Sequence, residues 1–502
     1  MNILPDTEEN RLLAENVHPA DWVNPVPTER YNLAVIGAGT AGLVCAAGAA
    51  GLGGKIALIE RHLMGGDCLN AGCVPSKGII RAARAAHDAR NSAGLGVNSD
   101  LNFDFSVAME RMRRIRAGLS HHDSARRFRD ELGVDVFIGE ARFCGPDCIQ
   151  VGDTRLFFAK AAVCSGARAA APSIPGLAEA GYHTNETIFS LTELPPRLAV
   201  IGAGPIGCEL AQAFARFGSQ VTLLQSGAQI LEREDRDAAE ILHDTLRKEG
   251  IDLRLGVSIK EAQRRGSDRI IYMQKGTALQ EIAVDEILVG VGRAPNTEGL
   301  GLEAAGITYD SAGIIVNDTL QTSNPHVYAA GDICSKFKFT HTADAQARIL
   351  IANALFMGRQ KTSALTIPWC TYTDPEIAHV GLYAQNAQKQ GYEVTTLTVS
   401  LSEVDRAVID GESEGFARVH LRSGSDRILG VTIVAKHAGE MISEFSLAIT
   451  NGLGLKAIAK TIHPYPTQAE ALKKLGDAYN RTRLTPFLKR LLTGWLKWQR
   501  RK

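Results

Sequence analysis

The sequence predicts an α/β fold with two Rossmann-like nucleotide-binding domains and a C-terminal α+β domain. Two glycine-rich fingerprints, GAGTAG at 37–42 and GAGPIG at 202–207, each follow a strand pattern and open a helix pattern. After Pro368 the apolar residues alternate as in antiparallel strands, at 417–421 and 428–435, which predicts a separate third domain. A chain of 502 residues has room for three domains of ordinary size.

Composition and charge exclude several classes of protein. Lysine plus arginine equals aspartate plus glutamate at 55 each, so no net charge favours a nucleic-acid partner. Nine cysteines in so long a chain are not typical of a disulfide-rich secreted protein, which favours a cytoplasmic protein with reduced thiols except where its chemistry requires otherwise. No segment is apolar enough to span a bilayer, and residues 1–30 read as an irregular acidic extension without a signal-peptide core.

The order strand, fingerprint, helix, strand occurs twice, over 31–60 and over 197–225. The glycines of such loops permit a tight turn and bring a pyrophosphate close to the helix N-terminus. Two copies therefore predict two dinucleotide sites. The fingerprint residues expected to bind them are Gly37, Gly39, Thr40, Ala41, Gly42, Gly202, Gly204 and Gly207.

The residue that ends the second strand of each unit indicates which nucleotide binds. Glu60 lies 23 positions after Gly37 (60 − 37), and Gln225 lies 23 positions after Gly202 (225 − 202). Glu60 can accept hydrogen bonds from both ribose hydroxyls, which suits a nucleotide without a 2′-phosphate, such as FAD. Gln225 carries no charge to repel a 2′-phosphate, and nearby Arg233 is either the partner of that phosphate or a solvated surface arginine. The second unit is predicted to bind NADPH or NADH, with NADPH slightly favoured.

Cys68 and Cys73 lie in the run GGDCLNAGCVPSK at 65–77, shortly after the first fingerprint. The glycines and proline of this run allow an irregular backbone in which the two cysteines could pair. A helix N-terminus and the neighbouring Lys77 would favour the reactive thiolate. We interpret the pair as a redox dithiol rather than as two inert core cysteines. A metal site is not predicted, because no second Cys/His pair has ligand spacing.

The other cysteines are expected to have no redox role. Cys144 and Cys148 lie near each other, but nothing around them indicates a site. Small core residues are expected at Cys45, Cys164, Cys208, Cys334 and Cys370.

On these motifs the chain resembles the FAD-dependent class I pyridine nucleotide–disulfide oxidoreductases, from about residue 31 to 480. The same resemblance extends to GAGPIGCE at 202–209, GVGRAPN at 290–296 and TSNPHVYAAGD at 322–332. It implies electron transfer from NAD(P)H through FAD to the sulfur pair, with Cys73 against the flavin and Cys68 exchanging with the substrate.

The resemblance also implies an ion pair between Lys77 and Glu209 beside flavin N5, although a glutamate there could otherwise be a surface residue. The further cofactor-binding residues that it implies are Glu60, Gly66, Asp67, Lys77, Ala141, Gly166, Glu209, Arg233, Val257, Gly292, Arg293 and, on the FAD ribitol, Asp332.

The family likeness implies a homodimer in which the C-terminal segment of one subunit completes the active site of the other. The expected domains are an N-terminal extension (1–30), an FAD-binding domain (31–180 and 296–367), an NAD(P)-binding domain (181–295), a dimerisation domain (368–480) and a basic amphipathic tail (481–502).

The segment 461–470 indicates a branch of the family. Tyr465 stands where the disulfide reductases carry the histidine of a His–Glu pair, while Glu470 is present; tyrosine at this position resembles mercuric reductase. A phenol of pKa about 10 is a poorer proton donor to a leaving thiol than an imidazole of pKa about 6.5, but it can hydrogen-bond a thiolate or position a metal–thiolate complex. His463 is a candidate acid or a structural histidine. Unlike mercuric reductases, this sequence has no terminal Cys-Cys, its last cysteine being Cys370.

The predicted function is therefore a mercuric-reductase-like NAD(P)H oxidoreductase whose acceptor is Hg(II), another soft metal ion or a disulfide. A dihydrolipoamide dehydrogenase-type reductase is the alternative within the family. A membrane-associated, flavin-bound redox sensor or scaffold is the alternative from another class. Residues 481–502 motivate it, because they hold eight Lys/Arg, no acid and an apolar stripe at helical spacing. Such a helix could lie on the inner face of an anionic membrane, or pack on the protein's own body or its dimer mate.

Overall fold

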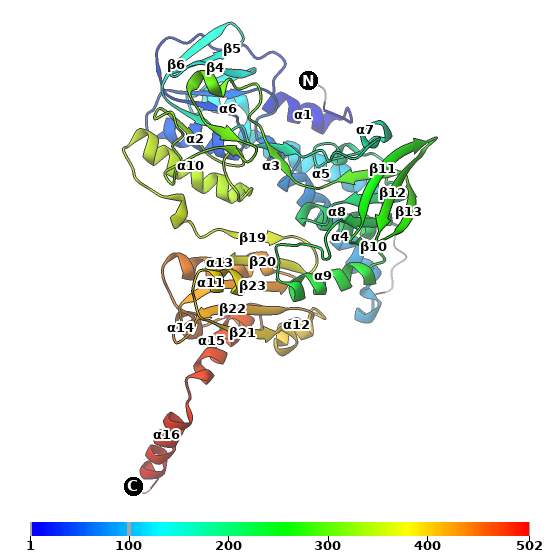
Figure 1. The fold of residues 1–502 in the computed structure, drawn as a ribbon, viewed down its shortest axis with the longest axis vertical. Helices are drawn as coiled ribbons and strands as arrows, with labels where there is room; N and C mark the ends of the chain where they lie inside the picture. The colour runs from blue at the N-terminus through cyan, green and yellow to red at the C-terminus, as the bar shows by residue number, and fades with distance from the viewer. Residues whose placement is uncertain (1–2, 98–101, 501–502) are drawn as a thin grey trace. The chain divides into compact units, whose positions relative to one another are not determined.

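The computed structural model describes residues 3–97 and 102–500 (Figure 1). Residues 1–2 of the predicted extension and residues 501–502 of the predicted tail lie outside this part. Contacts divide the chain into two units, one of Met1–Ile230 with Leu246–Leu365 and one of Leu231–Thr245 with Thr366–Lys502. Each unit has a hydrophobic core of its own.

The larger sheet of the first unit carries the first fingerprint. Its strand order is β3-β2-β1-β6-β5-β4, and β18 also pairs with β6. The strands β3, β2, β1, β6 and β18 are parallel, whereas β4 and β5 form an antiparallel hairpin that continues into β6. Their bounds are β1 (Tyr31–Ile36), β2 (Ile56–Glu60), β3 (Asp135–Ile138), β4 (Ala141–Gly145), β5 (Cys148–Val151), β6 (Thr154–Val163) and β18 (Val327–Ala329).

Parallel strands are normally covered on both faces, and β1 with its run YNLAVI is almost wholly buried. Figure 1 shows α2 and α10 side by side in this unit, and the two helices are in contact. Because β1, β6 and β18 are parallel, their carboxyl ends meet at one edge, where the first fingerprint and the segment after β18 come together. The helices of this unit are α1 (Glu8–Val17), α2 (Thr40–Gly51), α3 (Gly66–Asn70), α4 (Cys73–Arg90), α5 (Phe105–Ser120), α6 (Ala125–Asp130), α7 (Leu177–Ala180), α8 (Pro205–Phe217) and α10 (Thr340–Leu355).

A second parallel sheet, of order β10-β9-β8-β14, carries the second fingerprint. A three-stranded antiparallel sheet and two short ribbons complete the first unit. The observed β8 and β9 confirm the predicted strands 197–201 and 220–225. The bounds are β7 (Ala167–Ala169), β8 (Arg197–Ile201), β9 (Gln220–Gln225), β10 (Asp252–Leu255), β11 (Ser258–Arg265), β12 (Asp268–Lys275), β13 (Ala278–Val284), β14 (Glu286–Val289), β15 (Arg293–Pro295), β16 (Tyr309–Asp310) and β17 (Gly313–Ile314).

The second unit is built on a five-stranded antiparallel sheet of order β19-β20-β23-β22-β21, as the alternation after Pro368 predicts. Helix α13 packs against this sheet, and their buried residues form one core. Most of α9 (Arg236–Lys248) also belongs to this unit. The other bounds are β19 (Pro368–Thr371), β20 (Glu376–Gly381), β21 (Val394–Ser400), β22 (Phe416–Arg422), β23 (Ile428–Ala435), α11 (Ala384–Lys389), α12 (Asp405–Ile409), α13 (Ala438–Thr450), α14 (Leu455–Lys460), α15 (Glu470–Thr482) and α16 (Pro486–Gln499).

The N-terminal extension is not irregular, contrary to the expectation. Residues 8–17 form helix α1, whose N-terminus is capped by the Thr7 hydroxyl accepting the Asn10 N–H at 3.3 Å. Leu13 and Val17 are buried in the core of the first unit, so packing against the body supplies the stability that a ten-residue helix lacks alone.

Across residues 3–97 and 102–500, no helix is long and apolar enough to cross a membrane.

Candidate functional site

The structure brings Cys68 and Cys73 together as free thiols that hydrogen-bond to each other. Cys68 lies on the short helix α3, and Cys73 is the first residue of α4. The turn into α3 requires glycine, because Gly65 and Gly66 have φ of +87° and +57° and a Cβ on Gly66 would lie 2.6 Å from the Cα of Gly39. The dithiol loop is thus packed directly against the first fingerprint.

The two thiols differ in acidity. The hydrogen bond from Cys68 lowers the pKa of Cys73 to about 6, and the Thr340 hydroxyl, 3.3 Å from the Cys73 sulfur, and the Lys77 ammonium lower it further against the effect of burial. The same sulfur–sulfur hydrogen bond, together with burial, raises the pKa of Cys68. Cys73 is therefore the thiolate near neutral pH and Cys68 the thiol. The position of Cys73 at the N-terminus of an 18-residue helix favours the same assignment.

This difference predicts a pH dependence. In the dithiol holoenzyme, the long-wavelength absorbance of a thiolate against the flavin should appear as the pH rises through about 6, because Cys73 loses its proton there. A hydrogen bond to a charged group contributes ~1.5 kcal/mol, which is about one pKa unit, so Thr340→Val should move the midpoint up by about one unit. Thr340→Ser keeps the hydroxyl and should titrate like the unmodified protein. Equal midpoints for the valine and serine variants would contradict the assignment.

Lys77 and Glu209 form the predicted ion pair, with Nζ 2.9 Å from Oε2. Lys77 lies one turn after Cys73 on α4, and Glu209 comes from the first turns of α8, directly after the second fingerprint. The Glu209 side chain is 6% exposed, so the interpretation as a surface glutamate is wrong. The pair links the dithiol helix to the helix of the second nucleotide fingerprint.

The first fingerprint fits the adenosine and pyrophosphate of FAD. Glu60 accepts the Ala38 N–H at 2.7 Å, which fixes the carboxylate beside the loop, and burial raises the pKa of this carboxyl. Only glycine fits at position 37, where φ is +98° and a Cβ would lie 2.4 Å from the Cys164 carbonyl oxygen.

Asp332, the expected ribitol ligand, lies after β18, and burial raises its pKa while the Arg293 charge opposes this. Arg293 reaches Asp67 with Nη1 at 2.8 Å and Asp332 with Nε at 3.3 Å. Arg293 thus joins two residues expected to contact FAD. A dinucleotide loop, a ribose carboxylate and a buried aspartate fit an FAD site.

The second fingerprint repeats this geometry with an amide. Gln225 Oε1 accepts the Ala203 N–H at 3.0 Å, the same contact that Glu60 makes with Ala38. Position 202 also admits only glycine, with φ of +99° and a Cβ position 2.6 Å from the Gly290 carbonyl oxygen. The counting of 23 positions therefore identified equivalent residues, and the amide gives this loop no acidic group at the ribose position.

The other predicted cofactor residues stay predictions. Arg233 is exposed and belongs to the second unit, whereas Gln225 belongs to the first. Gly166 and Gly292, beside β7 and β15, have φ of +67° and +140°. Ala141 and Val257 are buried.

Two residues of the site were missed. Thr340, the first residue of α10, contacts Cys73, and Asn185 donates from Nδ2 to Asp67 at 3.0 Å and to the Ala71 carbonyl at 3.2 Å. Both lie more than a hundred positions from the dithiol in the sequence, outside any motif, so no local signal indicates them.

The C-terminal candidates lie in the second unit. The Tyr465 hydroxyl donates to Asp405 at 2.8 Å, and this hydrogen bond raises the pKa of the phenol. His463 is almost covered and contacts the Glu444 carboxylate at 3.1 Å. Glu470 Oε2 is buried and has no hydrogen-bond partner among residues 3–97 and 102–500.

Comparison with known proteins identifies the family. The family described as pyridine nucleotide-disulphide oxidoreductase matches residues 31–347, and the dimerisation domain of the same family matches residues 367–475. The chain belongs to the pyridine nucleotide-disulphide oxidoreductases.

Relatives within this oxidoreductase family are named for different substrates. The chain is 34% identical to a mercuric reductase of Staphylococcus aureus, over 88% of this chain and 81% of the relative, and 34% identical to a dihydrolipoyl dehydrogenase of Thermus scotoductus, over 90% and 98%. Among solved structures it is similar to the HOCl-induced flavoprotein disulfide reductase RclA from Escherichia coli, with a TM-score of 0.80, 27% identity and coverage of 89% and 99%. A Cu(II) complex of RclA gives a TM-score of 0.81 at 27% identity, over 90% and 100% of the two chains.

The protein is therefore an FAD-dependent NAD(P)H oxidoreductase of the class that reduces sulfur groups or metal ions, and a homodimer as in its family. These findings confirm the predicted fold class, cofactors and type of enzyme.

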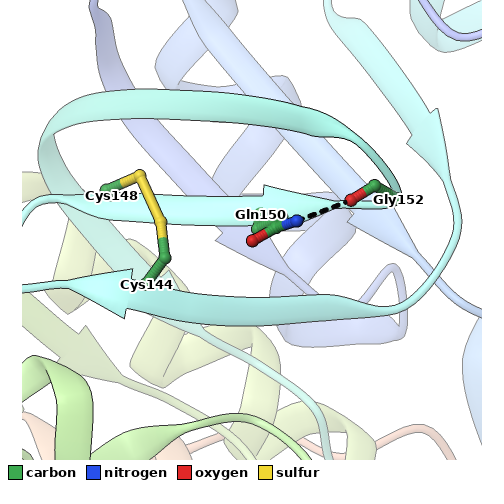
Figure 2. Close-up of a disulfide and its surroundings, with 4 residues drawn as sticks. All are labelled: Cys144, Cys148, Gln150 and Gly152. Carbon is green, nitrogen blue, oxygen red and sulfur yellow. Dashed lines mark hydrogen bonds between the residues drawn. A yellow bond between two sulfur atoms is a disulfide. The ribbon is translucent and has the colours of Figure 1, made fainter.

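One expectation about the cysteines of this oxidoreductase is wrong. Cys144 and Cys148 form a disulfide across the β4–β5 hairpin, with their Cα atoms 5.4 Å apart (Figure 2). The register shifts between Phe143 and Gly145, which lets the exposed Cys144 face the buried Cys148 across the turn. The Gly-Pro-Asp turn between the two cysteines was the available sequence signal. Cys45, Cys164 and Cys208 are buried as expected, and Cys334 and Cys370 partly so.

Proposed function

We propose that this reductase delivers electrons to a thiophilic metal ion such as Hg(II) or Cu(II), with a disulfide as the second acceptor class. The first fingerprint, Glu60 and Asp332 would hold FAD, which would supply hydride acceptance from NAD(P)H and two-electron transfer to the Cys68–Cys73 pair. Cys73 is the sulfur next to the flavin, and Cys68 meets the acceptor. Lys77 and Glu209 hold a fixed charge pair where the nicotinamide arrives. Two adjacent sulfurs suit a soft cation, because thiolates are its preferred ligands.

Tyr465 is the residue that favours a metal ion over a disulfide as the acceptor. Reduction of Hg(II) to Hg(0) consumes two electrons and no proton, whereas reduction of a disulfide to two thiols consumes two electrons and two protons. The phenol of Tyr465 hydrogen-bonds Asp405 and has a raised pKa, so it is a poor acid at neutral pH. The imidazole of His463 is held by Glu444. A site with this proton supply suits metal reduction better than disulfide reduction.

In the homodimer, Tyr465 and Glu470 complete the dithiol site of the other subunit. The apolar side chains Ile462 and Tyr465 are 92% and 69% exposed, which supports an interface at this segment. A steady-state screen of Hg(II), Cu(II), lipoamide, glutathione disulfide and quinones with both nicotinamides tests the proposal. The metal ions should support the fastest NAD(P)H oxidation. Robust turnover of lipoamide would instead favour the dihydrolipoamide dehydrogenase alternative, and failure of NAD(P)H to reduce the flavin would favour a sensor or scaffold.

NADPH is the proposed donor, because the ribose position of the second fingerprint carries an amide. Gln225→Glu should lower kcat/KM for NADPH by about tenfold and improve use of NADH, since a carboxylate repels a 2′-phosphate and accepts from a ribose hydroxyl. Steady-state kinetics with both nicotinamides measure the ratio. Gln225→Asn, which keeps the amide without a charge, is the matched control. An unchanged ratio in the glutamate variant would place the discriminating residue elsewhere.

The tail 481–502 is proposed to bind an anionic membrane surface peripherally. At 3.6 residues per turn, helix α16 has a cationic face (Lys489, Arg490 and Lys497) and, opposite it, a wide apolar face. The apolar face consists of Phe487, Leu488, Leu491, Leu492, Trp495, Leu496 and Trp498.

Every side chain from 481 to 500 is solvent-exposed, so this apolar face is not buried within the part of its unit that the structure describes. The Trp495 and Trp498 rings lie 5.0 Å apart, at the apolar side of the helix. Tryptophan with a surrounding of lysine and arginine suits the boundary between headgroups and acyl chains. The charge is complementary to anionic lipid, since the tail holds eight Lys/Arg and no acid in a chain of zero net charge.

Deleting residues 481–502 should abolish co-sedimentation with vesicles that contain phosphatidylserine or phosphatidylglycerol, while NAD(P)H oxidation continues. The full chain should bind such vesicles, bind phosphatidylcholine vesicles weakly and dissociate at high salt, because each basic residue contributes about 1 kcal/mol near an anionic surface. The triple variant Lys489→Glu, Arg490→Glu, Lys497→Glu keeps the apolar face and should lose binding as well. Unchanged sedimentation of the truncated protein would end the membrane proposal, and a change in its oligomeric state would show that the tail packs on the dimer mate.

A further inference from the structure

The loop that carries Cys68 is held by residues from the N-terminal extension, which precedes the family match at 31–347. The Met64 N–H donates to the Val17 carbonyl oxygen at 3.1 Å, at the C-terminal end of α1. The His18 imidazole contacts the carbonyl oxygen of His62. The extension therefore contacts the chain directly before the dithiol loop.

A buried arginine makes a third connection. Arg116 on α5 is 5% exposed, donates from Nη2 to Asn10 Oδ1 of α1 at 2.7 Å and donates from Nη1 to the Asn70 carbonyl oxygen at 2.8 Å. Asn10, itself 2% exposed, is oriented by donating from Nδ2 to the Pro5 carbonyl oxygen at 2.8 Å. Burial lowers the pKa of Arg116 to about 10, which leaves the guanidinium charged at neutral pH.

Asn70, which accepts the Arg116 hydrogen bond, belongs to the helix that carries Cys68. It is the last residue of α3, and its Nδ2 donates to the carbonyl oxygens of Met64 at 3.0 Å and Gly66 at 2.8 Å. These bonds close the turn around Cys68 from both ends. A buried guanidinium that donates to two neutral oxygens is costly to leave without these bonds, so they constrain the geometry of the loop strongly.

We infer that helix α1 and Arg116 form a clamp that positions Cys68 for exchange with the acceptor, with Asn10 and Arg116 as positioning residues. The inference rests on the proposed role of Cys68 as the acceptor-facing sulfur. The contacts of the clamp end on His62, Met64 and Asn70, that is, on α3 and the chain directly before it. Cys73 and Lys77 are fixed separately by α4, so hydride entry and acceptor exchange are set by different contacts.

The test compares Asn10→Leu with Asn10→Asp in the full-length holoenzyme. Leucine removes the acceptor of the guanidinium hydrogen bond, whereas aspartate keeps an acceptor of the same length. In the leucine variant, the rate of Cys68 alkylation by iodoacetamide in the dithiol form should change by about tenfold, followed on the Cys68 peptide by mass spectrometry because the Cys73 thiolate reacts as well. The kcat/KM for Hg(II) should fall by a similar factor. Flavin reduction by NAD(P)H and the Cys73 thiolate absorbance should stay within about twofold, because α4 is untouched. The aspartate variant keeps the acceptor for Arg116 but loses the donor to the Pro5 carbonyl oxygen, so its alkylation rate should stay closer to that of the unmodified enzyme than the leucine variant's does.

Three outcomes would overturn the clamp: an unchanged alkylation rate in Asn10→Leu, an equal loss in Asn10→Asp, or a parallel loss of FAD and of flavin reduction. Arg116→Lys keeps the charge but cannot make both hydrogen bonds in the same geometry. Its alkylation rate should lie between those of the unmodified enzyme and Asn10→Leu. This variant tests the clamp if Asn10→Leu fails to fold. Alkylation of Cys68 does not depend on which acceptor the enzyme reduces. If the proposed acceptor is wrong, the change in the alkylation rate of Asn10→Leu should still be seen. If the clamp is wrong, that change should be absent.

Discussion

Cys73→Ser should lower acceptor-dependent NAD(P)H oxidation by on the order of 10³-fold or more while FAD stays bound. Serine cannot form a disulfide or accept electrons, so the pair loses its two-electron capacity, and removal of a covalently acting residue costs factors of this size. Anaerobic titration with NAD(P)H provides the second measurement. The flavin should still be reduced, but the long-wavelength thiolate absorbance should be absent because Cys73 supplies the thiolate.

Cys144→Ser is the matched control, since it removes another exposed cysteine of the same unit that belongs to the β4–β5 disulfide. It should retain turnover and the thiolate absorbance. Full activity of Cys73→Ser, or persistence of the absorbance in that variant, would disprove the role of this sulfur. Loss of activity in both variants would show that the general redox state of the protein, rather than Cys73, limits turnover.

Glu209→Gln should slow flavin reduction by NAD(P)H by about 10²-fold, the size of effect seen when one preorganised polar group is removed from an active site. Glutamine keeps the shape of the side chain but removes the carboxylate that lies 2.9 Å from the Lys77 ammonium. A buried glutamate that loses its charge no longer fixes the lysine at the position where we propose that the hydride arrives. Stopped-flow absorbance of the flavin measures the step directly.

Glu240→Gln is the control for the second prediction, because it breaks an exposed ion pair with Arg236 that contributes little. Flavin reduction in this variant should match the unmodified enzyme. If Glu209→Gln reduces its flavin at the normal rate but fails with the acceptor, the ion pair would serve the sulfur side rather than the nicotinamide side.

The sequence predicted the fold and the centre of the site because their signals are local. The strand–fingerprint–helix order located both parallel sheets, and counting from the first glycine found Glu60 and Gln225, which the structure shows in equivalent contacts. The distance from Cys73 to Lys77 in the sequence is one helical turn, so their common side of α4 also followed from spacing.

The missed features depend on contacts between distant segments. Thr340 reaches Cys73 only because α10 begins at the same sheet edge, and Arg116 reaches Asn70 only because α5 packs beside α3. The sequence predicts an irregular segment in place of helix α1 because most residues there are polar or acidic, and Leu13 and Val17 are the two apolar residues of the helix that are buried. The Cys144–Cys148 disulfide depends on a register shift, and periodicity does not reveal such a shift.

Cys73 and Lys77 lie on the one helix α4, whereas the segment 461–470, which we propose meets the acceptor, lies far away in the sequence. Electron uptake can therefore stay constant while the outlet is remodelled. Exchanging residues 461–470 for those of a lipoamide-specific relative should therefore change the preferred electron acceptor and leave the rate of flavin reduction by NAD(P)H unchanged. The protein would then be a convenient starting point for building reductases of new specificity.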